Sequence, residues 1–156
     1  MDKQTAIKQV RDGYSELLAS VQGLDEPAMN KVFYGDWSVK DLLAHISGWH
    51  HEMTRSMERM ARGEKPTPEG VSYADGDAWN AKFTENTTPG KASLAGWDAG
   101  FQEYVSAARA LGEDQYGTDP ASGKPRIGNR LLQGAGIGHL AEHREELDAW
   151  LMGRNG

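Results

Sequence analysis

Apolar residues recur at spacings of three and four along four segments of the chain, which is the period of one face of an α-helix. The first segment carries Ile7, Val10, Tyr14, Leu17 and Val21. The other three run from Ser38 to about Arg62, from Leu94 to Leu111, and from about Asn129 to Leu151. No segment has convincing strand character, because none alternates apolar and polar residues over the length of a strand. The pattern predicts an all-α protein built from four amphipathic helices.

The segments between these helices indicate how they are connected. Ser38 with Asp41 resembles a capping box at the start of the second helix, with Asp in place of the usual Glu. The stretch 63–90 is rich in Gly and Pro, and residues 75–83 within it could form a short helix. A second stretch of this kind, 112–128, precedes the fourth helix. We therefore expect one domain, a four-helix bundle with long crossover loops and short extra helices.

Composition narrows the classes of function. The chain has 156 residues, a formal net charge of −6 and a sequence pI of about 5.3. It contains no cysteine, which excludes disulfides and thiolate chemistry from the chain itself and fits a reducing compartment. Lys and Arg are scattered without a basic stripe, so we expect no nucleic-acid partner. There is no apolar run of about 18 residues and no signal-peptide core, so we expect no membrane partner and a cytoplasmic location.

Three histidines are the candidates for chemistry. His139 and His143 lie four residues apart, so on a helix they point the same way one turn apart, and both face inward with the core stripe. His45 lies at the edge of the apolar stripe of the second helix. Three histidines with an open position are typical of catalytic zinc, whereas buried histidines can also be hydrogen-bonded core residues. His50 and His51 point away from His45, and we expect both at the surface.

Small residues before the histidine pair have two interpretations. Gly134, Gly136 and Gly138 weaken a helix, because glycine costs helix stability. They could leave a pocket beside a metal ion, or they could allow close packing of two helices. The sequence does not choose between these alternatives.

Two motifs carry a resemblance to a known family. The segment from Trp37 to Ile46, WSVKDLLAHI, is followed by Trp49, and the segment 138–143 reads GHLAEH. Together they resemble the second and fourth helices of the DinB/YfiT-like superfamily. The segments 77–80 (DAWN) and 147–151 (LDAWL) look most like the ClbS/DfsB branch.

The resemblance implies both a site and an activity. It implies a four-helix bundle that holds a divalent metal, zinc or nickel, through His45, His139 and His143. Relatives include thiol-dependent transferases and isomerases that use bacillithiol, mycothiol or glutathione. We therefore expect a hydrolase or a thiol-dependent S-transferase acting on a small electrophilic molecule, with a low-molecular-weight thiol as co-substrate. Homodimers occur among the relatives, so a homodimer is compatible with the resemblance.

Two further hypotheses remain open beside the metalloenzyme. A protein similar to ClbS would give resistance by binding or hydrolysing a reactive natural product without needing the metal. A bundle with a purely structural metal would lose stability on chelation and have no exchangeable water at the ion.

Three polar side chains are candidate acid–base or metal-supporting groups. Glu52 lies two turns beyond His45 on nearly the same side of the helix, so it could reach the pocket or stay solvated. Asn80 belongs to the family motif, although capping or a loop hydrogen bond would also explain it. Glu142 lies directly before His143. We assign these three as the candidate catalytic residues.

Overall fold

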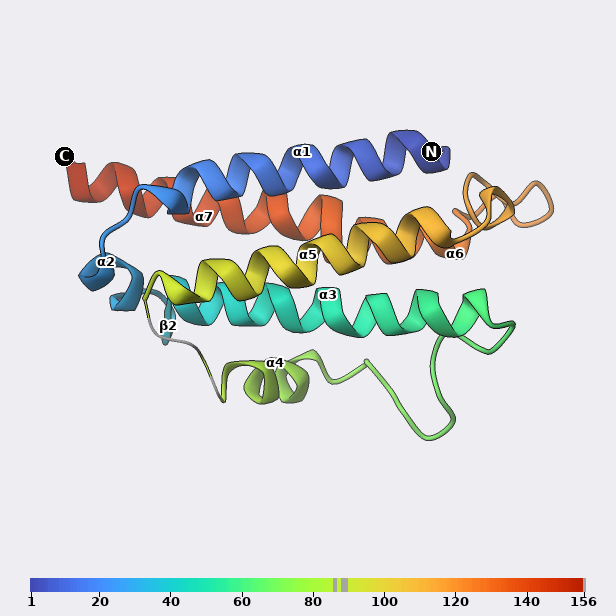
Figure 1. Ribbon diagram of the computed structural model, residues 1–156, viewed down its shortest axis with the longest axis horizontal. Helices are drawn as coiled ribbons and strands as arrows, with labels where there is room; N and C mark the ends of the chain where they lie inside the picture. The colour runs from blue at the N-terminus through green and yellow to red at the C-terminus, as the bar shows by residue number, and fades with distance from the viewer. Residues whose placement is uncertain (86, 88–89, 156) are drawn as a thin grey trace.

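The computed structural model describes residues 1–85, 87 and 90–155, and these residues are mostly helical (Figure 1). The three uninterrupted long helices are α1 (Lys3–Gln22), α3 (Val39–Ala61) and α5 (Ala92–Ala110). A fourth is formed by α6 (Ile127–Leu132), a π turn η2 (Gln133–Ile137) and α7 (Gly138–Asn155). Shorter elements are α2 (Glu26–Asn30), α4 (Gly76–Thr84) and the 3-10 turn η1 (Glu113–Gln115). The predicted four-helix bundle with extra short helices is confirmed.

The four long helices pack side by side around one core. In Figure 1 the colours show that α3 and α5 run in the same direction, and that α1 and α7 run in the opposite one. The connection from α3 to α5 is therefore a true crossover, and it carries α4 along the outer side of α3. Residues 86, 88 and 89 of this connection lie outside the described residues. Trp97, Phe101 and Tyr104 of α5 are buried at the centre, where Phe101 stacks on Tyr14 of α1 with ring centroids 3.9 Å apart.

The predicted capping box sets the start of α3. The backbone N–H of Ser38 donates to the Asp41 carboxylate at 2.9 Å, and the Ser38 hydroxyl accepts from the Asp41 N–H at 3.4 Å. These bonds satisfy donors that a helix start would otherwise leave free. The cap matters for function because it fixes the first turns of the helix that carries His45.

The expectation that the chain has no strand is wrong for one short hairpin. Strand β1 (Val32–Tyr34) pairs antiparallel with β2 (Trp37–Ser38), with Val32 opposite Ser38 and Tyr34 opposite Trp37. Strands of two and three residues are too short for an alternating pattern to be visible. Gly35 has φ +54°, a left-handed conformation that glycine adopts without strain, and it allows the tight turn.

The fourth helix is interrupted by the π turn directly before His139. Two carbonyls in this region accept hydrogen bonds from side chains of other helices: Leu131 O from the Tyr104 hydroxyl at 2.8 Å, and Ala135 O from a His50 ring nitrogen at 3.0 Å. A π turn carries one more residue than the α-helical turn it replaces, so it changes the direction in which the following residues point. The turn therefore helps to decide where His139 faces.

The two interpretations of the small residues each hold at a different glycine. At Gly136 an added Cβ would lie 2.8 Å from a Val10 methyl and 3.1 Å from the Tyr104 hydroxyl, so this glycine permits close helix packing. At Gly134 nothing lies within 4 Å of such an atom, and the residue borders an open pocket.

Among the described helices, none combines the length and apolar character needed to cross a membrane.

Candidate metal centre

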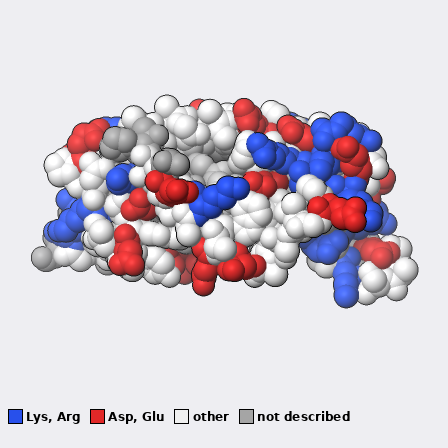
Figure 2. All heavy atoms as spheres, turned by 90° about the horizontal axis from the view of Figure 1, so that it is seen from below, with Lys and Arg blue, Asp and Glu red and all other residues white. Residues whose placement is uncertain are grey.

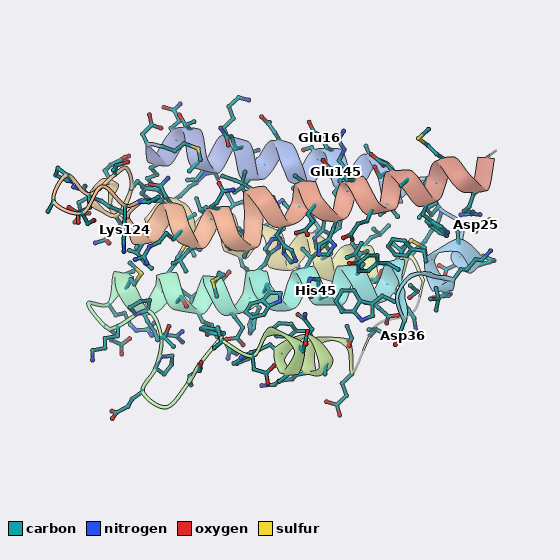
Figure 3. The ribbon with its side chains drawn as sticks, turned by 180° about the vertical axis from the view of Figure 1, so that it is seen from behind. Glu16, Asp25, Asp36, His45, Lys124 and Glu145 are labelled. Carbon is teal, nitrogen blue, oxygen red and sulfur yellow. The ribbon has the colours of Figure 1, made fainter. Side chains whose placement is uncertain are left out.

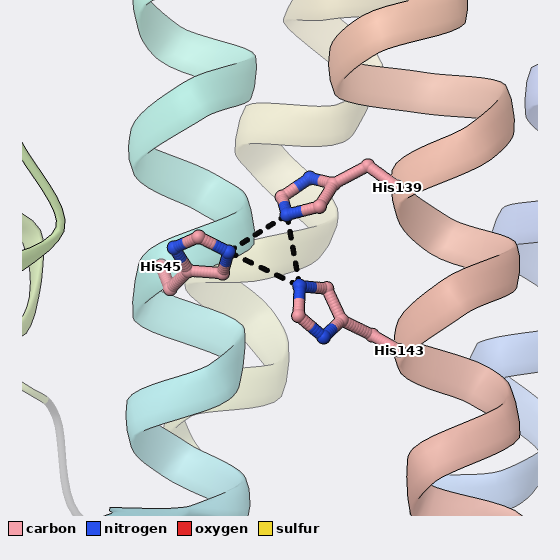
Figure 4. Close-up of side chains that lie close together, drawn as sticks. All are labelled: His45, His139 and His143. Atoms are coloured by element: carbon pink, nitrogen blue, oxygen red, sulfur yellow. Dashed lines mark hydrogen bonds between the residues drawn. The ribbon is translucent and has the colours of Figure 1, made fainter. Parts of the chain in front are cut away.

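The three predicted histidines meet between α3 and α7 (Figure 4). The Nε2 atom of His45 lies 2.7 Å from that of His139 and 3.1 Å from that of His143. The Nε2 atoms of His139 and His143 are 2.9 Å apart. Each ring thus presents the same nitrogen to one small volume between the helices. In Figure 3 the His45 ring extends from α3 toward α7, at the middle of the bundle.

Burial keeps the imidazoles of His45 and His139 neutral. His45 is 5 % exposed and His143 is 7 % exposed. Burial, together with the neighbouring His139 and His143, lowers the pKa of His45 to about 3. Burial and His143 lower the pKa of His139 to about 4. A neutral imidazole has one lone pair available, which is the form that binds a metal ion.

The partner of His45 fixes which of its nitrogens carries the proton. The side-chain Oδ1 of Asn80 lies 2.8 Å from His45 Nδ1 and also accepts from the Trp49 indole N–H at 2.8 Å. An indole N–H can only donate, so the Asn80 atom facing it is the oxygen. The same oxygen can only accept from His45, which places the imidazole proton on Nδ1. His45 Nε2 is therefore a bare lone pair.

His143 is held in the same tautomer by a carboxylate. Its Nδ1 lies 2.8 Å from Oε2 of Glu146, one turn along α7. The carboxylate accepts, so in the neutral ring Nδ1 carries the proton and Nε2 is again a bare lone pair. Two lone pairs facing each other at 3.1 Å repel unless a cation lies between them. The arrangement therefore fits a divalent ion, and Asn80 and Glu146 are the hydrogen-bond acceptors that orient its ligands.

The third histidine is held differently. His139 Nδ1 is buried and has no hydrogen-bond partner among the residues that the structure describes. Its position depends on α7 and on the π turn before it rather than on a side-chain acceptor. The group His45, His139 and His143 has the ligand number and type of an open three-histidine site.

The predicted surface position of His50 is wrong. His50 is fully buried and its ring stacks on Tyr104 of α5, with centroids 4.6 Å apart and planes at 14°. The helical wheel treats a helix as having one buried face, whereas α3 packs against α5 on one side and against the π turn on another. Burial lowers the pKa of His50 to about 3. His51 is exposed, as predicted.

The three candidate catalytic residues lie in different surroundings. Asn80 contacts His45 directly, as described above. Glu52 instead accepts a hydrogen bond from the Tyr73 hydroxyl at 3.0 Å, in the segment after α3. Glu142 is exposed and lines neither of the two cavities that border the histidines. Their catalytic roles remain predictions, and the geometry favours Asn80.

Sequence reasoning named Glu142 and missed Glu146. The signal was present in the spacing, because residues three apart on a helix are neighbours and Glu146 is three residues after His143. Tyr34 was also missed, and Trp37 was noted only as part of the family motif, since both belong to the unexpected hairpin. The centroid of the Trp37 ring lies 4.6 Å from that of the His45 ring. Tyr34 and Trp37 line a cavity that also borders His45.

Cavities open on two sides of the histidines. One, of about 530 Å³, is lined by polar groups of α4 and the hairpin and by His45 and His143. The other, of about 310 Å³, is bordered by His139 and by apolar side chains of α3. A metal ion at this centre would be reachable by two separate small molecules.

Comparison with known families agrees with this architecture. The chain matches the family described as the mycothiol maleylpyruvate isomerase N-terminal domain over residues 10–129, and it belongs to that family. This stretch includes His45 and Asn80 and ends before His139 and His143. No sequence among the curated proteins matches the chain.

Solved structures of low sequence identity share the fold of this chain. The colibactin self-resistance protein ClbS in complex with double-stranded DNA has a TM-score of 0.81 and 19% identity, covering 96% of this chain and 95% of that one. DfsB, described as a sibling lethal factor precursor, has a TM-score of 0.79 and 15% identity, covering 99% of this chain and 97% of that one. The mycothiol-dependent maleylpyruvate isomerase has a TM-score of 0.72 and 17% identity, covering 94% of this chain and 61% of that one.

The prediction that nucleic acid is excluded as a partner is wrong. ClbS, which shares this fold, was crystallised with double-stranded DNA. Net charge sums over the whole surface and does not report where charges gather. Figure 2 shows several Lys and Arg side chains, with Asp and Glu among them, at the end of the molecule where α3 ends and α6 begins.

Proposed function

We propose that this protein is a metal-dependent enzyme that acts on a small electrophilic molecule with the help of a low-molecular-weight thiol. The enzyme either joins the thiol to that molecule or uses the thiol to isomerise that molecule. The observation that carries the proposal is the convergence of the Nε2 atoms of His45, His139 and His143 within 3.1 Å of one another, because a cation among them would stabilise lone pairs that otherwise repel. Membership of the mycothiol maleylpyruvate isomerase N-terminal family supports a thiol as co-substrate. The chain has no cysteine, so the reacting sulfur must come from outside.

The residues around the centre have separable tasks. A bound divalent ion would supply Lewis acidity, which favours the thiolate over the thiol and polarises a carbonyl. Asn80 and Glu146 hold the Nδ1 protons of His45 and His143 and so keep both Nε2 atoms directed at one point. Trp37 lies against one side of the His45 ring, with ring centroids 4.6 Å apart. The two cavities give room for a thiol and an electrophile to approach from different sides.

A thiol-consumption assay tests this proposal. Zinc- or nickel-loaded protein would be incubated with glutathione, bacillithiol or mycothiol and a model electrophile such as monochlorobimane. We expect conjugation above the uncatalysed rate with at least one thiol, and loss of both metal and activity in His139→Ala. Enzyme-dependent loss of the electrophile at the same rate without any thiol would instead identify a hydrolase. Equal activity in His139→Ala would contradict a role for the metal.

A second candidate function is resistance to a reactive natural product. It is favoured by the similarity in fold to ClbS and by the Lys and Arg side chains that lie, with Asp and Glu among them, at one end of the molecule in Figure 2. This function predicts protection of cells, or binding of a duplex oligonucleotide, that survives the His139→Ala change. Protection that requires the three histidines would assign the activity to the metal centre instead.

A further inference from the structure

The smaller cavity beside the metal centre has an unusual lining. Its walls are Trp49 and Met53 of α3, Gly134 and Ala135 of the π turn, and His139, with Arg130 of α6 at its rim. The volume of about 310 Å³ suits a small molecule. The space exists because Gly134 has no side chain and nothing else approaches it. The cavity thus leads from solvent to a metal ligand along mostly apolar walls.

Arg130 is the one charged side chain among the residues that line this cavity. Its guanidinium makes no hydrogen bond or ion pair with any residue that the structure describes, as is also true of Arg11, Arg55 and Arg109. Arginine stays charged at all ordinary pH values, and its planar fork matches a carboxylate. An unpaired arginine beside an apolar wall has donors available for an anionic ligand.

The surroundings of Arg130 strengthen the positive charge at this rim. Arg130 also borders a neighbouring surface hollow that contains Lys124 and Arg126. The acidic residue of that hollow, Asp119, accepts hydrogen bonds from the Ala121 N–H and the Ser122 hydroxyl within its own loop. The local field therefore favours a negatively charged group, although the chain as a whole carries a net charge of −6.

We infer that this cavity binds a small molecule with an apolar body and a carboxylate, and that Arg130 holds the carboxylate while the body lies against Trp49 and Met53. In the proposed enzyme, on which this last step rests, the molecule is the electrophilic substrate and its reactive end points toward His139. The larger polar cavity on the other side of the histidines is then left for the thiol. The substrate class is therefore acidic electrophiles rather than neutral or cationic ones.

A titration with matched probes tests the binding step without metal or thiol. Metal-free ¹⁵N-labelled protein would be titrated with 4-phenylbutyrate and with the neutral 4-phenylbutyramide, following the indole N–H signal of Trp49, assigned with Trp49→Phe. We expect the acid to bind about tenfold more tightly than the amide, the lower range for a charge-assisted hydrogen bond at an exposed arginine. Arg130→Gln should remove this preference, and the surface control Lys124→Gln should keep most of it.

A second variant tests whether the probe binds in this cavity. Gly134→Leu fills the open space, so it should weaken binding of both probes while the fold is retained. Equal affinity for acid and amide in the wild-type protein, or an unchanged preference in Arg130→Gln, would overturn the inference. Because these titrations use metal-free protein, their failure would leave the metal-dependent reaction untouched. Conversely, a protein that binds no metal but prefers the acid would contradict only the proposed function.

Discussion

Glu146 offers the sharpest test of how the centre is built. Its carboxylate lies 2.8 Å from His143 Nδ1, and the two side chains are 21 % and 8 % exposed, so solvent screens this contact only in part. Acceptors of this kind orient a ligating imidazole and raise its basicity, and their loss typically costs about 10-fold to 100-fold in metal affinity. Glu146→Gln keeps an acceptor and loses the charge, whereas Glu146→Leu loses both.

The two variants should therefore form a graded series. We expect zinc affinity about tenfold weaker in Glu146→Gln, equivalent to about 1.4 kcal/mol, and up to about 100-fold weaker in Glu146→Leu, about 2.7 kcal/mol. Competition with a chromophoric chelator at pH 7.5 would measure these affinities. Glu142→Gln is the matched control, because Glu142 is on the same helix, carries the same charge and is exposed. It should bind zinc within about twofold of the wild-type protein, since an exposed charge is largely screened.

Two outcomes would refute this reasoning. Wild-type affinity in Glu146→Leu would mean that the carboxylate does not support the ligand. An equal loss in Glu142→Gln would mean that overall charge, rather than the contact with His143, determines affinity. Thermal unfolding of the metal-free variants would separate either result from a general loss of structure.

Three further predictions concern the packing around the centre. Gly136→Ala should destabilise the protein by about 1–3 kcal/mol through overpacking against α1 and α5, whereas Gly134→Ala should be neutral or stabilising by up to about 1 kcal/mol. Denaturant unfolding measures both free energies of unfolding. Equal effects of the two variants would contradict the view that Gly136 serves helix packing and Gly134 borders a pocket. Gly48→Ala should displace α4, because its Cβ would overlap the Phe83 ring, and it should therefore weaken metal binding. Unchanged metal affinity would argue against support from α4. His50 has its pKa lowered to about 3 from an ordinary 6.5, so the unfolded chain takes up its proton first and stability falls as the pH drops through this range. The uptake of this proton should lower the free energy of unfolding of the metal-free protein by about 2 kcal/mol between pH 7 and pH 5. The same dependence of unfolding free energy on pH in His50→Gln would contradict this prediction.

The helical framework could be predicted from the sequence because its signals are local and repeated. The apolar stripe of α3 and the Ser38 cap both lie within the segment that they define, and the observed helix Val39–Ala61 lies within the predicted limits. The hairpin could not be predicted in this way, since strands of two and three residues have no period. Its importance comes only from where the fold places Tyr34 and Trp37.

The three histidines of the candidate site were predictable from the sequence, and their surroundings were less so. His45, His139 and His143 follow from helix spacing and family resemblance, and the structure brings them together. His50 was misplaced because the number of faces that α3 buries depends on the tertiary arrangement. Glu146 and Glu142 both flank His143 in sequence, and only the direction of the His143 ring distinguishes them. Arg130 has no sequence signal, because its role depends on the space left by Gly134.

Metal content is the measurement that tests the central claim most directly. Untagged wild-type protein and His139→Ala would be compared by elemental mass spectrometry, both as purified and after reconstitution with zinc and with nickel. The account predicts about one equivalent of zinc or nickel per wild-type chain and little in the variant. A wild-type protein that holds no metal even after reconstitution, or a variant that holds as much as the wild type, would contradict it.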